Sequence, residues 1–440
     1  MVKSFSQGQS RNTSRREFLT TSAALAGTVV AGSLGIDRAA HAAGSDVIKI
    51  GLIGCGGRGS GAAVNAMNAG EDVRLVAMAD IFEDRLKVAR ERIQKMKPDQ
   101  VAVDDDHCFV GFDAYQKVID SGIDVLLIAA TSHFHPVMFK AAIDAGKHVF
   151  CEKPHGLDVP GLKVSMAACE EARKKNLCVV SGLCWRYDVA VRETMKRIQD
   201  GAIGDIIAIQ ENYLTAPYIC RARKPEWNEF EYQMQNWYHF NWLSGDQTSQ
   251  QLIHSIDKAS WAMGDVPPVK AFGLGGRQVC LDPIYGDQFD HHSVVYEYEN
   301  GVRVFAHCRD IPNCNNTTSD IILGTKGRAI MPVRCRIEGE NEWQFRGKKP
   351  SMYDNEHKEL FEAIRAGKTI NNGDYMVTST MLGILAQMVC YTGKEITWEQ
   401  AMQSKLDFSL ERYDWDAEAP IKPDADGRYA TAMPGITEFV

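Results

Sequence analysis

Two side chains of this sequence have the chemistry to polarise a hydroxyl group and to move its proton. Lys153 follows an apolar run and precedes Pro154, and His254 lies in a run with helical periodicity. An ammonium group polarises a hydroxyl or carbonyl oxygen, and an imidazole titrates near neutral pH, so it can take up and return a proton. Taken singly, each residue also has an ordinary interpretation, a lysine exposed to water and a histidine satisfied in the core.

A glycine motif stands well before these residues in the chain. It follows a predicted strand, opens a predicted helix, and consists of Gly54, Cys55, Gly56, Gly57, Arg58 and Gly59. In a G-x-G-x-x-G motif the glycines allow a tight turn, a close approach of the main chain to a pyrophosphate, and close helix–sheet packing. The helix N-terminus then offers free N–H groups to the phosphates. The motif predicts dinucleotide binding, the alternative being a glycine-rich loop without a ligand.

Asp80 ends the next predicted strand, 21 residues after Gly59. A carboxylate at this position accepts hydrogen bonds from the ribose hydroxyls and repels a 2′-phosphate, which favours NAD over NADP. Arg85 lies one helical turn further along and would suit NADP. We therefore predict NAD, with NADP as the alternative.

Polar residues follow two further apolar runs, where the carboxyl ends of parallel strands would meet at the ligand crevice. Thr131, His133 and His135 follow one run, and Glu152 and Lys153 follow the next. The spacing of the two histidines, i and i+2, is compatible with metal ligands, but no third ligand is indicated. We predict cofactor contacts here and no metal site.

The elements that must position these residues fall into two groups. Short, continuously apolar runs alternate with helical patterns over residues 46–184, which is typical of a doubly wound parallel sheet, a Rossmann domain. Residues 185–405 contain two predicted hairpins, one turning at Asn300-Gly301, and late helices. The predicted fold is therefore α/β, with a second α+β domain built on a large, mostly antiparallel sheet. Residues 406–440, rich in Pro, Asp and Gly, are predicted to form a surface tail.

The N-terminal residues resemble an export signal. Arg15-Arg16 precede a weakly apolar run, and Ala40-His41-Ala42 form a small-x-small cleavage pattern. We predict a cleaved twin-arginine signal over residues 1–42, recognised by the twin-arginine export machinery, and a periplasmic mature protein that does not associate with a membrane. An uncleaved anchor is the alternative, since the run approaches the ~20 residues that cross a bilayer.

Composition excludes several classes of protein. The chain of 440 residues carries a formal net charge of −8 and has no basic block, which argues against nucleic acid as a partner. Its twelve cysteines form no C-x-x-C pair, which argues against zinc ribbons and thioredoxin-like sites. Most of them are predicted to be buried free thiols.

Together these motifs identify the chain as similar to the Gfo/Idh/MocA oxidoreductase family. The glycine motif, the 130–135 stretch and Glu152-Lys153-Pro154 occur in the family's order, and the resemblance covers about residues 46–405. It implies an NAD(P)-dependent oxidoreductase acting on CH–OH groups. It also implies an open sheet in the second domain, used in the family for homodimer or homotetramer contacts.

The family carries its acid–base histidine in the pattern Asp-x-x-x-His-x-x-Asp. His254 and Asp257 match this pattern, whereas Gln250 replaces the first aspartate. Spacing places 250, 254 and 257 on one helical face. The resemblance implies that Lys153, His254 and Gln250 are catalytic, and that the uncharged Gln250 stabilises an imidazolium less than aspartate does.

The remaining predicted contacts complete the site. A run rich in aromatic and amide groups, residues 226–246, suits a small carbohydrate or polyol, because rings stack on C–H faces while polar tips meet hydroxyls. The predicted substrate-binding residues are Tyr187, Trp237, Tyr238, His239, Asn241 and Asp257. The predicted cofactor-binding residues are Gly54, Gly56, Gly57, Arg58, Gly59, Asp80, Thr131, His135, Glu152, Lys153 and Arg186.

The leading hypothesis is hydride transfer to or from a secondary hydroxyl of a sugar, polyol or glycoside, with a tightly bound cofactor. A tightly held dinucleotide would explain an export route that moves folded proteins. A second hypothesis is a glycoside hydrolase or lyase that oxidises its substrate transiently and recycles bound NAD. A third is a non-catalytic sensor or scaffold that keeps the cofactor, which the presence of both Lys153 and His254 disfavours.

Overall fold

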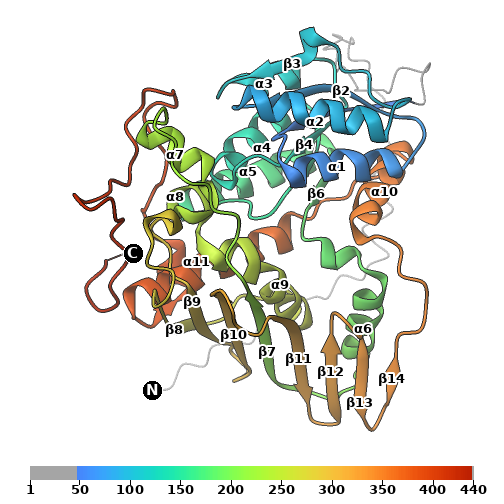
Figure 1. The fold of residues 1–440 in the computed structure, drawn as a ribbon. Helices are drawn as coiled ribbons and strands as arrows, with labels where there is room; N and C mark the ends of the chain where they lie inside the picture. Colours follow the sequence, from blue (N-terminus) through green and yellow to red (C-terminus); the bar gives the residue numbers. More distant parts are fainter. Residues whose placement is uncertain (1–46, 439–440) are drawn as a thin grey trace, which may run out of the picture. The chain divides into compact units, whose positions relative to one another are not determined.

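The computed structural model describes residues 47–438 (Figure 1). The predicted export signal, residues 1–42, lies outside these residues. Within the described range, no helix combines the length and the apolar character needed to cross a membrane.

The first sheet is parallel and has six strands in the order β3-β2-β1-β4-β5-β6. Its central strands, such as IKIGLI in β1 and VLLI in β4, are apolar and almost wholly buried, because helices cover both faces. Helices α1, α2 and α10 cover one face, and α3, α4 and α5 cover the other. The strands are β1 (Ile48–Ile53), β2 (Val73–Asp80), β3 (Cys108–Val110), β4 (Val125–Ile128), β5 (His148–Cys151) and β6 (Val179–Ser181). The helices are α1 (Gly57–Asn68), α2 (Glu83–Met96), α3 (Ala114–Asp120), α4 (His135–Asp144), α5 (Val159–Lys175) and α10 (Met352–Arg365).

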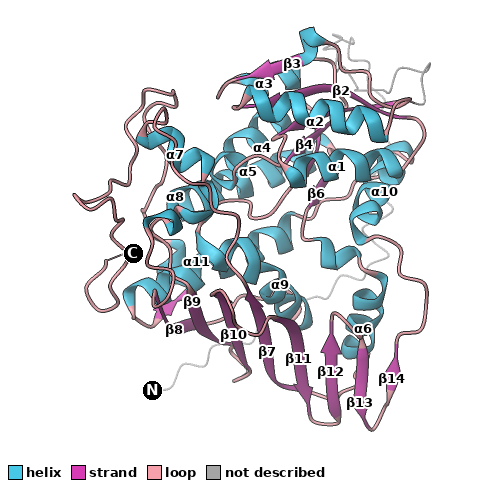
Figure 2. Ribbon diagram, in the orientation of Figure 1, coloured by secondary structure: helices cyan, strands magenta, loops and turns pink. Residues whose placement is uncertain are grey.

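The second sheet has nine strands in the order β14-β13-β12-β11-β7-β10-β9-β8-β15 (Figure 2). Both predicted hairpins, β9–β10 and β11–β12, are present and antiparallel, and only the central pair β7–β10 is parallel. The predicted fold class is thus confirmed. The strands are β7 (Ile206–Thr215), β8 (Lys270–Gly276), β9 (His291–Glu297), β10 (Arg303–Asp310), β11 (Thr317–Gly324), β12 (Gly327–Met331), β13 (Arg336–Gly339), β14 (Trp343–Gln344) and β15 (Ile396–Thr397).

Helices α6 (Val189–Gln199), α9 (Ile253–Ala262) and α11 (Gly373–Thr392) pack on one face of this sheet and share its core. The α10 helix belongs spatially to the first sheet, although it lies within the residues predicted for the second domain. Leu360 and Phe361 pack with the β1 and α1 side chains, and Asn371 pairs with Val179 at the edge strand β6. The chain therefore returns to the first sheet late in the sequence.

A third apolar cluster joins the C-terminal tail to the loops at the strand ends of the first sheet. Phe82 and Phe112 from those loops, Trp242 from the second domain and Trp415 from the tail belong to it. Two short helices, α7 (Glu229–Gln235) and α8 (Asn241–Ser244), contribute to this cluster, whereas α12 (Trp398–Met402) packs on the core of the second sheet. From Lys405 to Glu438 the tail contains no helix or strand.

All twelve cysteines lie in the described range and are free thiols, nine of them buried. This confirms the prediction that most are small buried groups rather than bridges.

Candidate active site

The glycine motif forms the turn between β1 and α1. Gly54 adopts a φ of +91°, which favours glycine, and a Cβ there would lie 2.4 Å from the Ala129 carbonyl oxygen. A Cβ on Gly59 would lie 1.8 Å from the Gly54 carbonyl oxygen, so the helix packs directly on the turn. By contrast, no atom lies within 4 Å of a Cβ built on Gly56 or Gly57. The open side of the turn has the room that a pyrophosphate needs at a helix N-terminus.

Asp80 lies beside this turn at the end of β2. Its carboxylate accepts hydrogen bonds from the Cys55 N–H at 2.7 Å and the Phe82 N–H at 2.9 Å. Burial raises the pKa of Asp80, and the two main-chain donors oppose that effect. The carboxylate is therefore held in one orientation at the mouth of the motif.

A cavity of about 390 Å³ connects these groups. Its lining includes the glycine turn, Asp80 and Thr131 from the first sheet, and Tyr218, Arg221 and Trp237 from the second domain. A narrow slot lined by Ile81, Phe112, Phe134 and Met138 continues from it. The cavity brings the predicted glycine, ribose-binding and strand-end residues together, with Trp237 facing them.

Arg58, predicted to bind the cofactor, is turned toward protein carboxylates. Its guanidinium contacts Glu152 and lies 3.2 Å from Glu356, and it stacks over the Tyr353 ring at 4.7 Å. Glu152 is 6% exposed and Glu356 is fully buried. The Arg58–Glu152 pair thus links the glycine turn to the strand end that carries Lys153.

His135 braces the two strand ends and does not face the cavity. It is 1% exposed, with Nδ1 2.7 Å from the Pro154 oxygen and Nε2 2.9 Å from the Ala130 oxygen. His133 contacts the Trp242 oxygen through Nδ1 and the Tyr413 hydroxyl through Nε2. Because all four ring nitrogens have protein partners, the pair serves packing.

Lys153 points to the N-terminal end of the His254 helix, where it donates a hydrogen bond to the main-chain carbonyl of Gln250. Burial lowers the pKa of Lys153 to about 8, and the nearby Glu152 opposes this effect. The partner carbonyl lies in a π-helical turn, Thr248–Leu252, a feature frequent at functional sites.

The Gln250 side chain points away from His254. Its amide donates to the Ser132 hydroxyl at 3.1 Å and to the Ser244 carbonyl. Both contacts hold this amide at the loop after β4 and at the end of α8 rather than at His254. The residue instead supplies its main-chain oxygen to Lys153 and joins α9 to the loop after β4.

His254 lies on α9, half-buried, with its ring stacked on Tyr213 at a centroid distance of 6.4 Å. Its Nδ1 is buried and has no hydrogen-bond partner among the described residues. Burial lowers the pKa of His254 well below its usual value, and the charges of Lys153, Lys258 and Arg58 add to this effect. These effects favour the neutral form of the imidazole, which is the form that accepts a proton.

Arg186 and Asp257, predicted at the cofactor and the substrate, bind each other instead. The Arg186 guanidinium donates to Asp257 at 2.8 Å and to Asp265 at 2.6 Å, between the rings of Trp261 and Tyr375. Arg186 is 7% exposed and Asp257 1%. These charges are buried, so each requires a partner, and neither is free for a ligand. Tyr187, 3% exposed, is likewise turned inward and donates to Asn372.

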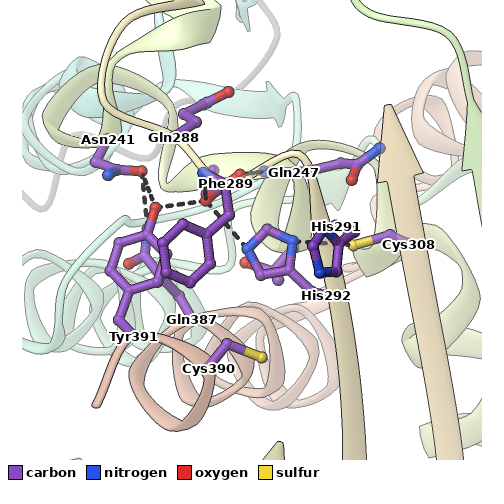
Figure 3. Close-up of polar contacts among 12 residues, drawn as sticks. Asn241, Gln247, Gln288, Phe289, His291, His292, Cys308, Gln387, Cys390 and Tyr391 are labelled. Carbon is purple, nitrogen blue, oxygen red and sulfur yellow. Dashed lines mark hydrogen bonds and ion pairs between the residues drawn. The ribbon is translucent and has the colours of Figure 1, made fainter. Parts of the chain in front are cut away.

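Of the four aromatic-stretch residues, only Trp237 lines the cavity. Tyr238 is buried and stacks on Tyr218 at 4.2 Å, and His239, whose pKa burial lowers to about 4, contacts Cys220. Asn241 belongs to a buried network in which it accepts from Tyr391 at 2.8 Å (Figure 3). Its amide also donates to Asp287. These three residues lie in the protein interior and are not part of the cavity lining.

Four residues of this region had no role predicted from the sequence: Tyr213, Tyr218, Arg221 and Ser132. Tyr213 and Tyr218 lie on or just after β7, far from any motif, and reach the site only through the sheet's position. Ser132 stood in the strand-end stretch but had no predicted role. Its contact with Gln250 is a tertiary feature that spacing does not reveal.

Comparison with known proteins agrees with this geometry. The family model described as "Oxidoreductase family, NAD-binding Rossmann fold" matches residues 48–181. The model described as "Oxidoreductase family, C-terminal alpha/beta domain" matches residues 195–379.

Among curated relatives, inositol 2-dehydrogenase of Salmonella typhimurium (strain LT2) is 26% identical over 73% of this chain and 87% of its own length. Myo-inositol 2-dehydrogenase of Thermotoga maritima is also 26% identical, but the match spans 50% of this chain and only 55% of that relative. Glycosyl hydrolase family 109 protein 4 of Phocaeicola vulgatus is 23% identical over 66% of this chain and 52% of its own length.

Solved structures share the fold. Levoglucosan dehydrogenase in complex with NADH and levoglucosan has a TM-score of 0.65 at 17% identity, covering 80% of this chain and 99% of that one. Aldose-aldose oxidoreductase from Caulobacter crescentus, complexed with glycerol, has a TM-score of 0.63 at 18% identity, with the same coverage.

Proposed function

The chain belongs to the Gfo/Idh/MocA oxidoreductase family, and we propose that it transfers a hydride between a nicotinamide cofactor and a secondary hydroxyl of a sugar, polyol or glycoside. The observation that carries this proposal is the convergence of Lys153 and His254. Lys153 reaches across the domains to the carbonyl of Gln250, one helical turn before His254. The Lys153 ammonium therefore lies at the start of the helix that carries the His254 imidazole, close enough for its charge to act on that ring.

The residues of the cavity fit a dinucleotide. Gly56 and Gly57 leave open space at the N-terminus of α1, and Asp80 is oriented toward the same mouth. A bound nicotinamide would supply the hydride acceptor or donor. The pyrophosphate would lie on the N–H groups of α1, and the ribose beside Asp80.

The chain's own groups then handle the hydroxyl. The Lys153 ammonium would hold the substrate oxygen and stabilise negative charge on it. His254 would take the hydroxyl proton on Nε2, because Nδ1 is enclosed in the protein, and would return it in the reverse direction. Trp237 lines the cavity of the glycine turn and Asp80, where its ring would offer a face to the bound dinucleotide.

Turnover on a defined panel tests this proposal. Purified protein would be mixed with NAD and, separately, NADP, and with myo-inositol, levoglucosan, glucose or methyl glycosides, and absorbance at 340 nm followed. We expect reduction with at least one compound and its loss in a His254→Asn variant. Equal rates in wild type and variant would refute the assigned role of His254.

We also propose that the cofactor is NAD and is tightly held. Asp80 favours NAD, whereas Arg85 and Arg221 in the same cavity would favour the 2′-phosphate of NADP. The tail contacts both domains: Phe408 N–H donates to Asp158 at 3.0 Å, and Gln233 donates to the Ile421 carbonyl. The Tyr413 ring of the tail also packs on Phe134, which lines the slot beside the cavity. Release would require these contacts to loosen. The protein would be purified without added cofactor and then denatured, and mass spectrometry would identify any nucleotide that it releases. A protein that releases no nucleotide would refute tight binding.

A second function rests on similarity to the glycosyl hydrolase family 109 proteins. In that case the chain would cleave a glycoside by transient oxidation and recycle its NAD. Release of the aglycone from a nitrophenyl glycoside, without net change at 340 nm, would favour it over the dehydrogenase. Net NADH formation would favour the dehydrogenase.

Export and assembly complete the proposal. We propose twin-arginine export of the folded, loaded protein to the periplasm, and homo-oligomers that use the open face of the nine-stranded sheet. That face exposes three apolar side chains, Leu274 on β8, Phe305 on β10 and Leu323 on β11. Fractionation of cells carrying an Arg15→Lys/Arg16→Lys variant tests export, and light scattering of a Phe305→Glu variant tests assembly.

A further inference from the structure

Beneath His254, on the side away from the cleft, lies a cluster of three buried ionisable residues: Glu211, Lys258 and Asp320. Glu211 on β7 and Asp320 on β11 are directly paired across the two antiparallel strands, and both point into the core. All three side chains are 0% exposed. Charges in such surroundings are costly unless they are compensated, so the cluster requires an explanation.

Lys258 connects this cluster to His254. Its Nζ lies 3.3 Å from Asp320 Oδ2 and donates at 2.6 Å to the main-chain carbonyl of His254, one turn earlier on the same helix. The Trp185 ring lies 5.2 Å away on the other side. The ammonium is thus fixed between the sheet and the residue that carries the imidazole.

One ammonium, that of Lys258, faces two carboxyl groups. Among the described residues, the carboxyl oxygens of Glu211 and Asp320 have no partner besides each other and this ion pair. Burial and the neighbouring Asp320 raise the pKa of Glu211 well above its usual value. This favours the neutral form of Glu211 beside the Lys258–Asp320 ion pair, whose ammonium end contacts the His254 main chain.

We propose that Lys258 is a positioning residue for His254: it anchors the α9 turn that carries the imidazole and, through its charge, keeps that imidazole unprotonated. This inference rests on the proposed role of His254 as proton acceptor. It also fits the replacement of the family aspartate by Gln250, because within the described residues the charges that act on the His254 ring are those of Lys153, Lys258 and Arg58, all cations. The neutral ring is the form that accepts the substrate proton.

The other charged groups around His254 act in the same direction or are neutralised. Lys153 and Arg58 also disfavour the imidazolium. Tyr213 stacks on the ring from β7. Arg186, behind α9, is compensated by Asp257 and Asp265. The effect of Lys258 on His254 can be measured apart from the effects of Lys153 and Arg58. Of these three cations, Lys258 is the one that belongs to α9 and donates to the His254 carbonyl.

The test measures the protonation of His254 directly, without a substrate. Histidine ring signals of the nucleotide-bound protein would be followed by NMR from pH 4 to 9, and His254 assigned as the signal absent from a His254→Gln variant. Lys258→Gln keeps a donor for both Asp320 and the His254 carbonyl but removes the charge. We expect the His254 pKa to rise by about one unit or more in this variant.

A second variant and a control keep the result interpretable. Lys258→Met with Asp320→Asn removes both charges together and should raise the His254 pKa as well. Lys147→Gln is the matched control, since Lys147 also donates to a main-chain carbonyl, that of Ile123, but lies in the first domain. Folded Lys258 variants whose His254 titrates as in wild type would overturn the proposal. Failure of every sugar in the activity panel would instead count against the proposed function, and leaves this measurement unaffected.

Discussion

Two sides of the site differ in the groups that they offer. The first-sheet edge, at the carboxyl ends of the parallel strands, offers main-chain groups and glycines. The α9 face, the side of α9 that carries His254, offers ionisable side chains held in the interior. At the first-sheet edge, Gly54 and Gly59 close on each other and Asp80 is fixed by two N–H groups. On the α9 face, His254 lies above a buried ammonium and two buried carboxyl groups.

The difference follows from what each face must do. A dinucleotide is bound by shape and by aligned N–H groups, so the first-sheet edge depends on the absence of side chains. Proton transfer depends on the balance between two protonation states, so the α9 face depends on charges placed at a distance. Substitutions should therefore fail in different ways on the two faces.

The largest expected effect is on catalysis at the α9 face. His254→Asn removes the proton acceptor, and we expect turnover to fall by about 10²–10⁴-fold. The nucleotide content should be unchanged, because His254 has no part in the first-sheet edge. Steady-state rates and mass spectrometry of released nucleotide measure the two quantities. A variant that loses the nucleotide as well would show that the two faces are not separable.

The next effect concerns the buried charges behind α9. Arg186→Met leaves Asp257, 1% exposed, without its cation, and we expect a loss of about 3–5 kcal/mol in the free energy of unfolding. Arg328→Met is the control, because the Arg328–Glu338 pair is largely exposed and should contribute less than about 1 kcal/mol. Urea unfolding of both variants compares them, and equal losses would contradict the distinction.

Two glycines divide the roles within the first-sheet edge. Gly59→Ala forces a Cβ against the Gly54 carbonyl and should cost about 1–3 kcal/mol in stability. Gly56→Ala has open space around it and should leave stability nearly unchanged while lowering the nucleotide content. Thermal unfolding and released nucleotide are the measurements. If Gly56→Ala keeps its full nucleotide content, the pyrophosphate does not lie there.

The dependence of turnover on pH tests the charge of Lys153, the ionisable group that the first-sheet edge contributes to the reaction. With a pKa of about 8, Lys153 loses its proton as pH rises through 8. If the ammonium is the working form, turnover falls about tenfold per pH unit above that value. Lys153→Arg keeps its charge, so its residual activity should lack this alkaline decline. A wild-type rate that stays level to pH 10 would exclude the role.

The smallest expected effect tests the tail. The Tyr413 hydroxyl donates to His133 and accepts from the Leu410 N–H, so Tyr413→Phe loses both hydrogen bonds, about 1 kcal/mol each. We expect nucleotide release to become several-fold faster, measured by the loss of bound-cofactor fluorescence under dilution. Tyr298→Phe, in the core of the second sheet, is the control. Equal release rates would leave the tail without a role in retention.

The first-sheet edge was largely predictable, because its residues follow their strands in order and parallel strands end at one edge. Gly54 to Gly59, Asp80 and Thr131 line one cavity, and Lys153 contacts the turn that precedes His254. The predictions for Arg186, Tyr187 and Asp257 differ from the structure, since burial gave them protein partners that spacing does not show.

The sequence by itself determined the two-sheet architecture, the glycine turn and the identities of the lysine and histidine, because periodicity and motif order are local properties of the chain. Only the tertiary structure decided which groups surround His254. Glu211, Asp320 and Lys258 come from two strands and a helix, and each was unremarked in the sequence. Their effect depends on distance and burial, which long-range packing sets. The same holds for the tail, which contacts residues of both domains that lie more than a hundred positions away along the chain.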